Sequence, residues 1–356
     1  MQPIRTVLVT GGAGYVGAAL VPRLLDAGYR VRVLDLYIFG DDVLAGSRGN
    51  PLLDEVRGDL RDQDLLREAL RGVDAVIHLA CISNDPSFEL DPDLGRSINY
   101  DAFPPLVRLS RSQGARRFIY ASSSSVYGVS KEANVDEDHP LAPITDYSRF
   151  KSLCEPILLD EAAPGFAPVV VRPATLCGVS PRQRLDLTVN ILTNHAVAKG
   201  VITVFGGKQM RPNLHIDDMV DLYLLLLKLP AERVSGRVYN AGCQNRTVAD
   251  LAAIVRGLVE RSVPRREKVE LTSTPTDDER SYHISAARLA RELGFKPRRT
   301  IENAVRNLIA AFRAGKLPDS LSDPRYFNVK ALKARLPDLL REPAPTEPFA
   351  QAAAAP

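Results

Sequence analysis

The segment Thr10-Gly11-Gly12-Ala13-Gly14-Tyr15-Val16-Gly17 joins an expected strand to an expected helix, and this arrangement identifies the fold. The apolar run Thr6–Thr10 predicts a buried strand, and Gly14–Ala27 predicts a helix that begins within the glycines. A second strand is expected at Arg30–Leu34, and an acidic residue, Asp35, follows it. A strand, a glycine-rich turn, a helix and a second strand ending in an acid together predict a dinucleotide-binding unit.

The spaced glycines have separate roles in such a loop. Gly11 permits a tight turn, Gly14 allows a pyrophosphate to approach the backbone, and Gly17 allows the helix and strand to pack closely. Free N–H groups at the start of the helix then bind the phosphates. Cofactor contacts are expected from Gly11, Gly14, Tyr15, Val16 and Gly17. Glycines that only turn the chain are the alternative interpretation.

Asp35 indicates which dinucleotide is bound. It lies 18 residues after Gly17, where a carboxylate accepts hydrogen bonds from the adenosine ribose hydroxyls. Since the same carboxylate repels a 2′-phosphate, we expect NAD rather than NADP. Asp59 and Leu60 follow a further short strand, and they are expected either at the adenine edge or at the start of a helix.

Short β-branched runs alternate with longer amphipathic segments through the first half of the chain. Apolar strands separated by helices are typical of a parallel sheet that is covered on both faces. The sequence therefore predicts a doubly wound α/β fold. Further strands are expected at Ala75–Leu79, Arg117–Ala121 and Val169–Arg172, and further helices at Asp62–Arg71, Ile98–Ser112 and Tyr147–Asp160.

The pattern loosens after Pro173. We expect a Rossmann domain over residues 1–173, whose core continues into parts of the later chain, and a smaller substrate-binding lobe over 174–315. A C-terminal extension is expected over 316–341, and a disordered tail over 342–356. Later helices are expected at Thr188–Lys199, Asp217–Leu229, Val248–Val263 and Ala286–Leu293, and a strand at Ile202–Phe205.

Composition argues against several kinds of partner. Basic and acidic residues nearly cancel, at 46 and 43, so the sequence predicts no nucleic-acid surface. Four cysteines without a close pair favour reduced thiols over disulfides or a metal site, so no metal is expected. The apolar run Leu222–Leu229 is less than half the length that spans a bilayer. We therefore expect a soluble, cytoplasmic protein without a membrane partner.

Tyr147 and Lys151 lie four residues apart in an expected helix, which places both on one helical face. An unperturbed tyrosine has a pKa of about 10, so it acts as a base near neutral pH only with help. A neighbouring ammonium group favours the phenolate. The pair predicts an acid–base couple that acts on a hydroxyl group, and an ordinary solvated helix face is the alternative.

A run of serines follows the strand Arg117–Ala121, at the sheet edge where ligands bind. The run is Ser122-Ser123-Ser124-Ser125-Val126-Tyr127-Gly128. A serine hydroxyl can accept one hydrogen bond while it donates another, so it can bridge the tyrosine and a substrate hydroxyl. A flexible turn is the alternative interpretation.

These segments together resemble the extended short-chain dehydrogenase/reductase family, and within it the NAD-dependent epimerase/dehydratase branch. The resemblance covers about residues 4 to 312. It also implies a homodimer, because the helices expected at Ile98–Ser112 and Tyr147–Asp160 pair between subunits in similar proteins. The matching motifs are Gly11–Gly17, Asp35, Gly58-Asp59-Leu60, Val76–Ala80, Asn99, Ser123–Gly128, Tyr147 with Lys151, Val171-Arg172-Pro173, Arg211–Asp218, Tyr239–Gly242 and Asp278–Tyr282.

The resemblance implies a role for each matching residue. Ser123, Tyr147 and Lys151 would be catalytic, with Lys151 as the activator of the tyrosine. Cofactor contacts are implied for Asp59, Leu60, Leu79, Ala80, Asn99, Tyr147, Lys151 and Pro173. A nucleotide sugar would be the substrate, with arginine forks on its diphosphate. Substrate contacts are implied for Ser124, Ser125, Thr175, Asn190, Arg211, Arg280 and Tyr282.

Two positions separate the reactions of this branch. Dehydratases carry an Asp-Glu pair where this chain has Ser124 and Ser125. Epimerases that act beside the ketone carry a cysteine at the position of Ser125. Serine can act neither as the carboxylic acid and base of a dehydratase nor as the cysteine base of the other epimerases. The resemblance therefore implies epimerisation at C4 through a transient keto sugar.

Other readings stay open on the sequence alone. The first is a nucleotide-sugar dehydrogenase or reductase with net turnover of NAD, and the second is a non-catalytic regulator that senses NAD. Thr175 and Cys177 depart from the usual residues of the branch, and the loop Ser180–Asp186 is unusually basic. Both departures fall in the expected sugar-diphosphate region, so the sugar and its nucleotide are not assigned.

Overall fold

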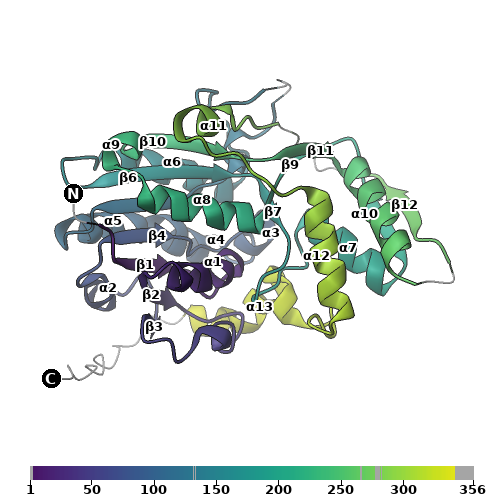
Figure 1. Cartoon of the computed structure of the whole chain (residues 1–356), viewed down its shortest axis with the longest axis horizontal. Coiled ribbons are helices and arrows are strands. Elements are labelled where there is room, and N and C mark those ends of the chain that lie inside the picture. The colour runs from purple at the N-terminus through teal and green to yellow at the C-terminus, as the bar shows by residue number, and fades with distance from the viewer. Residues whose placement is uncertain are drawn as a thin grey trace.

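The computed structural model describes residues 3–130, 132, 134–264, 267–276, 281 and 283–340. At its centre is a seven-stranded sheet in the order β10-β6-β5-β4-β1-β2-β3, in which every neighbouring pair is parallel (Figure 1). The strand order runs outward from β1 in both directions, which confirms the predicted doubly wound fold. The tail over 342–356, predicted to be disordered, lies outside the described residues.

The sheet takes its last strand from the second half of the chain. Its members are β1 (Thr6–Thr10), β2 (Arg30–Asp35), β3 (Leu53–Arg57), β4 (Ala75–His78), β5 (Arg117–Ala121), β6 (Ala167–Pro173) and β10 (Arg237–Ala241). Along β1, Val7 and Val9 enter one core cluster and Leu8 enters the other. Because both faces are buried, the strands are almost continuously apolar, as the sequence pattern indicated.

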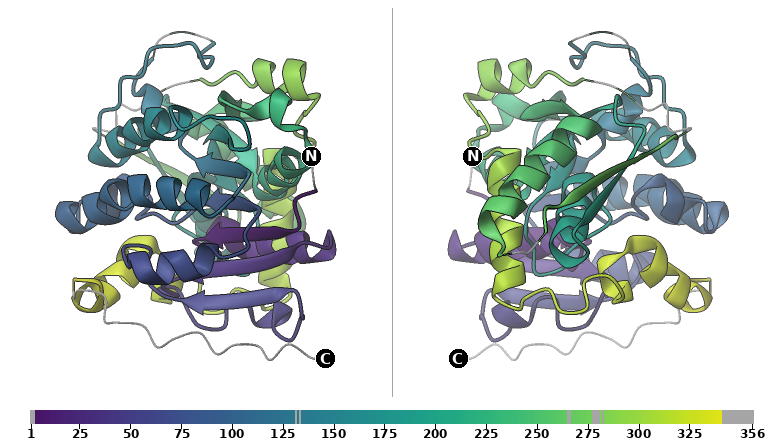
Figure 2. Two further views of the ribbon diagram at one scale, coloured as in Figure 1. Left: turned by 90° about the vertical axis from the view of Figure 1, so that its left-hand side faces the viewer. Right: turned by 90° about the vertical axis from the view of Figure 1, so that its right-hand side faces the viewer.

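Helices cover both faces of the sheet (Figures 1 and 2). The cluster on one face includes residues of α1 (Tyr15–Asp26), α8 (Ile216–Lys228) and α11 (Ala287–Leu293). The opposite cluster includes residues of α2 (Gln63–Leu70), α5 (Phe103–Ser112), α6 (Asp146–Leu159) and α13 (Asn328–Leu339). The helices α8 and α11 follow Pro173, so the first domain is completed by later chain.

The segment predicted as one helix over Ile98–Ser112 is divided in the structure. A π-helical turn spans Ser97–Asp101, and α5 begins only at Phe103. Pro104 and Pro105 have no N–H group to donate, so they fit only in the first turn of an α-helix. The two prolines therefore set the start of α5.

The smaller lobe has a core of its own. It is built from α7 (Thr188–Ala198), α10 (Val248–Ser262) and α12 (Ile301–Arg313). One three-stranded sheet joins β7 (Thr175–Cys177), β9 (Met210–His215) and β11 (Gln244–Thr247), and a strand pair joins β8 (Val201–Phe205) and β12 (Glu270–Thr274). In Figure 1 the lobe lies to the right of the large sheet, beyond the carboxyl ends of its strands.

The chain after α12 returns to the Rossmann domain. Leu332 and Leu339 of α13 are buried in the same cluster as α2 and α5. The backbone oxygen of Leu339 accepts a hydrogen bond from Arg61 at 3.0 Å. The C-terminal extension is thus packed against the fold. Across the described part of the chain, no helix is both long and apolar enough to cross a membrane.

Candidate active site

A cavity of about 630 Å³ lies at the carboxyl edge of the large sheet, between the Rossmann domain and the lobe. Its volume is in the range of small-molecule sites. The structure brings most of the predicted site residues into its wall. These are Gly11, Gly14, Tyr15, Val16, Gly17, Asp35, Leu60, Leu79, Ala80, Ser123, Ser124, Ser125, Tyr147, Lys151, Pro173, Thr175 and Arg211. Arg280 and Tyr282 lie outside the described residues.

The glycine loop is packed too closely for side chains at two positions. A Cβ on Gly11 would lie 2.5 Å from the backbone nitrogen of Ala80, and Gly11 has a φ of +76°. A Cβ on Gly17 would lie 2.5 Å from the carbonyl oxygen of Gly11. Gly14 is the N-cap of α1 and makes no side-chain cap, so the first N–H groups of the helix stay available to an anion.

Asp35 is fixed at the end of β2 by two backbone donors. Its Oδ2 accepts from Ala13 N at 2.9 Å, and its Oδ1 accepts from Tyr37 N at 2.7 Å. Burial raises the pKa of this carboxyl group, and the two N–H groups oppose that shift. The carboxylate is therefore held beside the glycine loop. This cradle for phosphates and this acid for a ribose fit NAD.

Lys151 belongs to the cavity wall and is buried, with 3% of its surface exposed. Its Nζ donates to the carbonyl oxygen of Ala121 at 2.7 Å. The same Nζ lies 4.9 Å from the ring centroid of Tyr120 and 6.0 Å from that of Tyr147. One backbone bond and one aromatic ring thus hold the ammonium group near the phenol of Tyr147.

The surroundings of Tyr147 favour its neutral phenol over the phenolate. Desolvation raises its pKa well above 10, and Cys81 and Asp85 add to the shift. Arg184 and a hydrogen bond with Ser123 act in the opposite direction. The phenolate needed for proton removal therefore depends on positive charge close to the ring.

Ser123 is positioned by its own turn. Its Oγ accepts from Ser125 N at 3.1 Å and lies 2.8 Å from the Oγ of Ser125. It caps the short turn Ser124–Tyr127, whose residues Ser124 and Tyr127 are buried. Ser123 lowers the pKa of Tyr147 and lines the same cavity, which suits a hydroxyl that bridges the phenol and a substrate hydroxyl.

A buried polar network supports the serine turn from below. Ser122 Oγ donates to Glu155 at 2.5 Å, and Glu155 pairs with Arg172 at 2.6 Å. Arg172 also donates to the hydroxyl of Tyr127 at 2.8 Å. Sequence analysis assigned no role to Glu155. Its spacing of four residues beyond Lys151 is the signal that placed it on the same face of α6.

Three predicted contact residues lie behind the cavity wall. Asp59 pairs with Arg61 at 2.6 Å. The side chain of Asn99 bonds to both the N–H and the carbonyl group of Ile82, at 2.8 and 2.9 Å. Asn190 is fully buried, and its Nδ2 donates to the hydroxyl of Tyr15 at 3.2 Å and to the carbonyl of Arg184 at 2.8 Å. Each of the three fixes a segment that does line the cavity.

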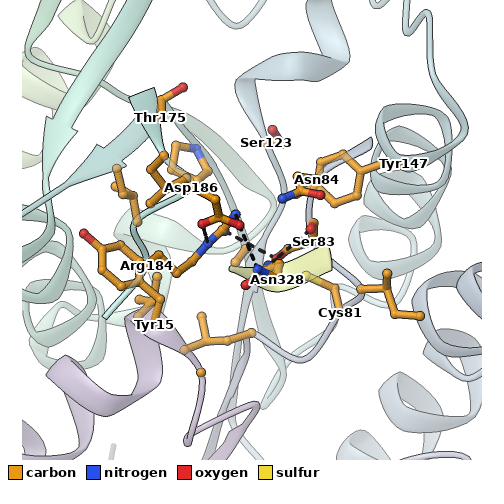
Figure 3. Close-up of a pocket in the computed structure, with 18 of the residues that line it drawn as sticks. Tyr15, Cys81, Ser83, Asn84, Ser123, Tyr147, Thr175, Arg184, Asp186 and Asn328 are labelled. Carbon is orange, nitrogen blue, oxygen red and sulfur yellow. Dashed lines mark hydrogen bonds and ion pairs between the residues drawn. The ribbon is translucent and has the colours of Figure 1, made fainter. Parts of the chain in front are cut away.

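The structure adds polar groups to the wall that sequence analysis left without a role. Arg184 pairs with Asp186 at 2.9 Å, and Asp186 accepts from the backbone of Asn328 at 2.9 Å. Asn328 Nδ2 in turn donates to Ser83 Oγ at 2.8 Å. Figure 3 shows these four residues together in the pocket, with Asn84 beside Tyr147. The basic loop was visible in the sequence, whereas nothing local marked Asn328.

Known proteins are similar to this chain over most of its length. The sequence model of the NAD dependent epimerase/dehydratase family matches residues 7–242. UDP-glucose 4-epimerase 2 of Arabidopsis thaliana is 30% identical over 333 residues, covering 85% of this chain and 94% of that protein. The dTDP-glucose 4,6-dehydratase of Streptomyces griseus is 30% identical over 302 residues, covering 82% and 89%.

A solved structure of MoeE5 in complex with UDP-glucose and NAD superposes with a TM-score of 0.74. Its sequence is 26% identical, and the match covers 87% of this chain and 99% of that one. The family is NAD-dependent and the MoeE5 structure contains NAD, which agrees with the cofactor predicted from the sequence. The chain belongs to the NAD-dependent epimerase/dehydratase family.

Proposed function

We propose that this protein epimerises a nucleotide-activated sugar at C4 through a transient keto intermediate. The observation that carries the proposal is the set of groups around Tyr147. Ser123 and Lys151 lie in the same cavity wall as the phenol, and a hydroxyl and an ammonium beside it suffice to move a proton to and from a carbinol oxygen. A group that removes a proton from carbon is not needed for this reaction.

The described carboxylates of the cavity wall already have hydrogen-bond or ion-pair partners. Asp35 accepts two backbone N–H groups beside the glycine loop. Asp85 accepts from Thr145 Oγ1 at 2.7 Å, and Asp186 pairs with Arg184. Ser124 and Ser125 have no acidic proton to exchange at neutral pH. These groups favour hydroxyl chemistry over dehydration.

The residues then have distinct tasks. When bound, NAD would supply reversible hydride acceptance at C4. Tyr147 takes the proton of the C4 hydroxyl as the ketone forms and returns it to the same oxygen when the ketone is reduced. Ser123 donates to that oxygen, and Lys151 stabilises the phenolate between the two halves. Protons and electrons balance over one cycle, so the protein turns over without net redox change.

The relatives support the same reaction. UDP-glucose 4-epimerases occur among them, and MoeE5 binds UDP-glucose together with NAD. The dehydratase of Streptomyces griseus is similar as well, which makes 4,6-dehydration the second candidate. That reaction needs an acid and a base at C5 and C6, where Ser124 and Ser125 stand.

The test is to incubate the purified protein with UDP-, GDP-, CDP- and dTDP-sugars in deuterated buffer and to follow the products by NMR. We expect inversion at C4 with no deuterium on carbon. Deuterium at C3 or C5, a 4-keto-6-deoxy product, or accumulating NADH would contradict the proposal. Tyr147→Phe should abolish inversion, whereas the matched control Tyr326→Phe, outside the cavity wall, should leave it intact.

A further inference from the structure

Arg182 is a buried cation in the cavity wall. It lies in the loop between β7 and α7, and 3% of its surface is exposed. Its Nη2 donates to Asn328 Oδ1 at 2.5 Å. Its Nε is buried without a hydrogen-bond partner, and none of the described carboxylates forms an ion pair with it. Asp186 and Asp35 attract the charge only from beyond ion-pair distance, and the neighbouring Arg184 repels it, so the charge has no anion in direct contact.

The other three buried arginines of the described residues differ from it. Arg172 pairs with Glu155 at 2.6 Å, and Arg184 pairs with Asp186 at 2.9 Å. Arg117 also has no described ion-pair partner, but it donates to the carbonyls of Leu226 and Leu229 at the end of α8. A helix C-terminus is partly negative, so Arg117 is compensated. The hydrogen-bond partner of Arg182 is only the neutral amide of Asn328.

An uncompensated buried charge is unfavourable, because it has lost its hydration and gained no anion. Burial lowers the pKa of Arg182 to about 9. The buried guanidinium of Arg182 therefore lowers the stability of the unliganded protein. An anion that enters the cavity would remove this cost.

The surroundings of Arg182 indicate which part of the cavity that anion occupies. Its Cζ lies 3.5 Å from the ring centroid of Phe39, which follows Asp35 in the same loop. Ser180 Oγ donates to the carbonyl of Tyr15 at 2.7 Å, so the loop that carries Arg182 is fastened to the first residue of α1. Arg182 thus borders the glycine loop on one side and the segment after Asp35 on the other.

We propose that Arg182 is a phosphate ligand that binds the diphosphate of the dinucleotide opposite the glycine loop. A guanidinium fork suits phosphate oxygens in charge and in shape. Asn328 is its positioning residue, because an amide oxygen orients Nη2 without neutralising the charge. The C-terminal extension thereby takes part in cofactor binding. The proposal rests on NAD binding alone and does not depend on epimerisation at C4.

The test compares three variants of the full-length protein. Arg182→Met removes the charge and keeps a long side chain against Phe39, and Arg182→Lys keeps the charge. Arg117→Met is the matched control, a buried arginine lost away from the cavity. The readouts are the NAD content of the purified protein, and the affinities for NAD, ADP and UDP from titration calorimetry and thermal shift.

Arg182→Met is expected to weaken NAD and ADP by about 10- to 100-fold, with UDP unchanged and the unliganded Tm equal to or above that of the wild type. Arg182→Lys should recover part of the affinity. Arg117→Met should lower Tm and leave ADP affinity unchanged. Wild-type binding of ADP by Arg182→Met would overturn the proposal, and weakened UDP with normal ADP would assign the residue to the substrate diphosphate instead.

A second variant keeps the test informative if Arg182→Met fails to fold. Asn328→Asp places a carboxylate against the guanidinium in place of the amide. We expect a higher Tm for the unliganded protein and a lower affinity for ADP, because the buried charge is then already neutralised. An unchanged or increased ADP affinity would contradict the proposal.

Discussion

The carboxylate of Asp85 accepts a hydrogen bond from the hydroxyl of Thr145 at 2.7 Å, and so ties the start of the short helix α3 (Asp85–Phe88) to the N-cap of α6. Tyr147 lies two residues farther along that helix. The bond therefore fixes a negative charge close to the phenol and raises its pKa. Burial of the ring is the largest cause of the raised pKa, and the charge of Asp85 adds to it.

Asp85→Asn should lower the pKa of Tyr147, because a neutral amide no longer disfavours the phenolate. An amide oxygen can still accept from Thr145, so the helix cap is retained. The acidic limb of the kcat profile should then move to lower pH, which steady-state assays across pH would measure. Asp93→Asn, an exposed change on α4 (Pro92–Arg96), is the control. A limb that stays fixed or moves to higher pH would refute the expectation.

Lys151→Met should lower kcat by about 100- to 10,000-fold, the usual range for losing acid–base assistance. The loss should be partly recovered as pH rises, since alkali replaces the help that the ammonium gives to the phenolate. Rates measured between neutral and alkaline pH would show this. Equal loss at every pH would mean that Lys151 acts only as a structural support for Ala121.

Glu155→Gln should destabilise the fold by about 3–5 kcal/mol, because it leaves Arg172 buried without its anion. Urea denaturation would measure the change in the free energy of unfolding. The double variant Glu155→Gln, Arg172→Met should recover much of the loss. If the two single changes simply add, the pair is not coupled and this account of the network fails.

Gly11→Ala should strip the protein of NAD, since the added methyl group meets the backbone of Ala80 and the positive φ is strained. Gly28→Ala is a matched control, because Gly28 has a φ of +83° but nothing within 4 Å of the added atom. It should carry the conformational strain, about 1 kcal/mol, without loss of cofactor. NAD content after gel filtration distinguishes the two. Retention of NAD by Gly11→Ala would count against the loop geometry.

We propose that a homodimer forms through α5 and α6. Leu153 of α6 is 42% exposed, which suits a residue covered by a partner subunit. Leu153→Arg should yield a monomer in light scattering with an unchanged circular dichroism spectrum. Leu321→Arg, at a residue 37% exposed in the C-terminal extension, should not change the mass. A monomeric wild type would end the proposal.

The sequence was sufficient for elements whose pattern is local. The strands Thr6–Thr10 and Arg117–Ala121 have the predicted bounds, because a buried parallel strand is an apolar run with clear ends. Helix α12 was also predictable. Helical spacing is followed by its buried residues Ile301, Ala304, Val305, Leu308 and Ile309, although no helix was predicted there.

Other features depend on contacts that no local pattern reveals. Asn328 reaches Ser83 across 245 residues, and an asparagine at the start of a helix gives no sign of such a partner. Asn190 was predicted to contact the substrate, but packing places it behind the cavity wall, where it bonds to Tyr15 and Arg184. Tertiary contacts, not propensity, set both placements.

The late position of β10 has a consequence for how the chain reaches its folded form. The central sheet lacks its outer strand until β10 has been made. One face of the sheet lacks its full cover until α11, which ends at Leu293, has been made as well. A nascent fragment ending near Pro173 leaves β6 as a bare edge able to pair with other chains. The Rossmann domain should therefore complete its folding only after the second half of the chain has been synthesised. In the finished protein the two halves should unfold together in one cooperative transition.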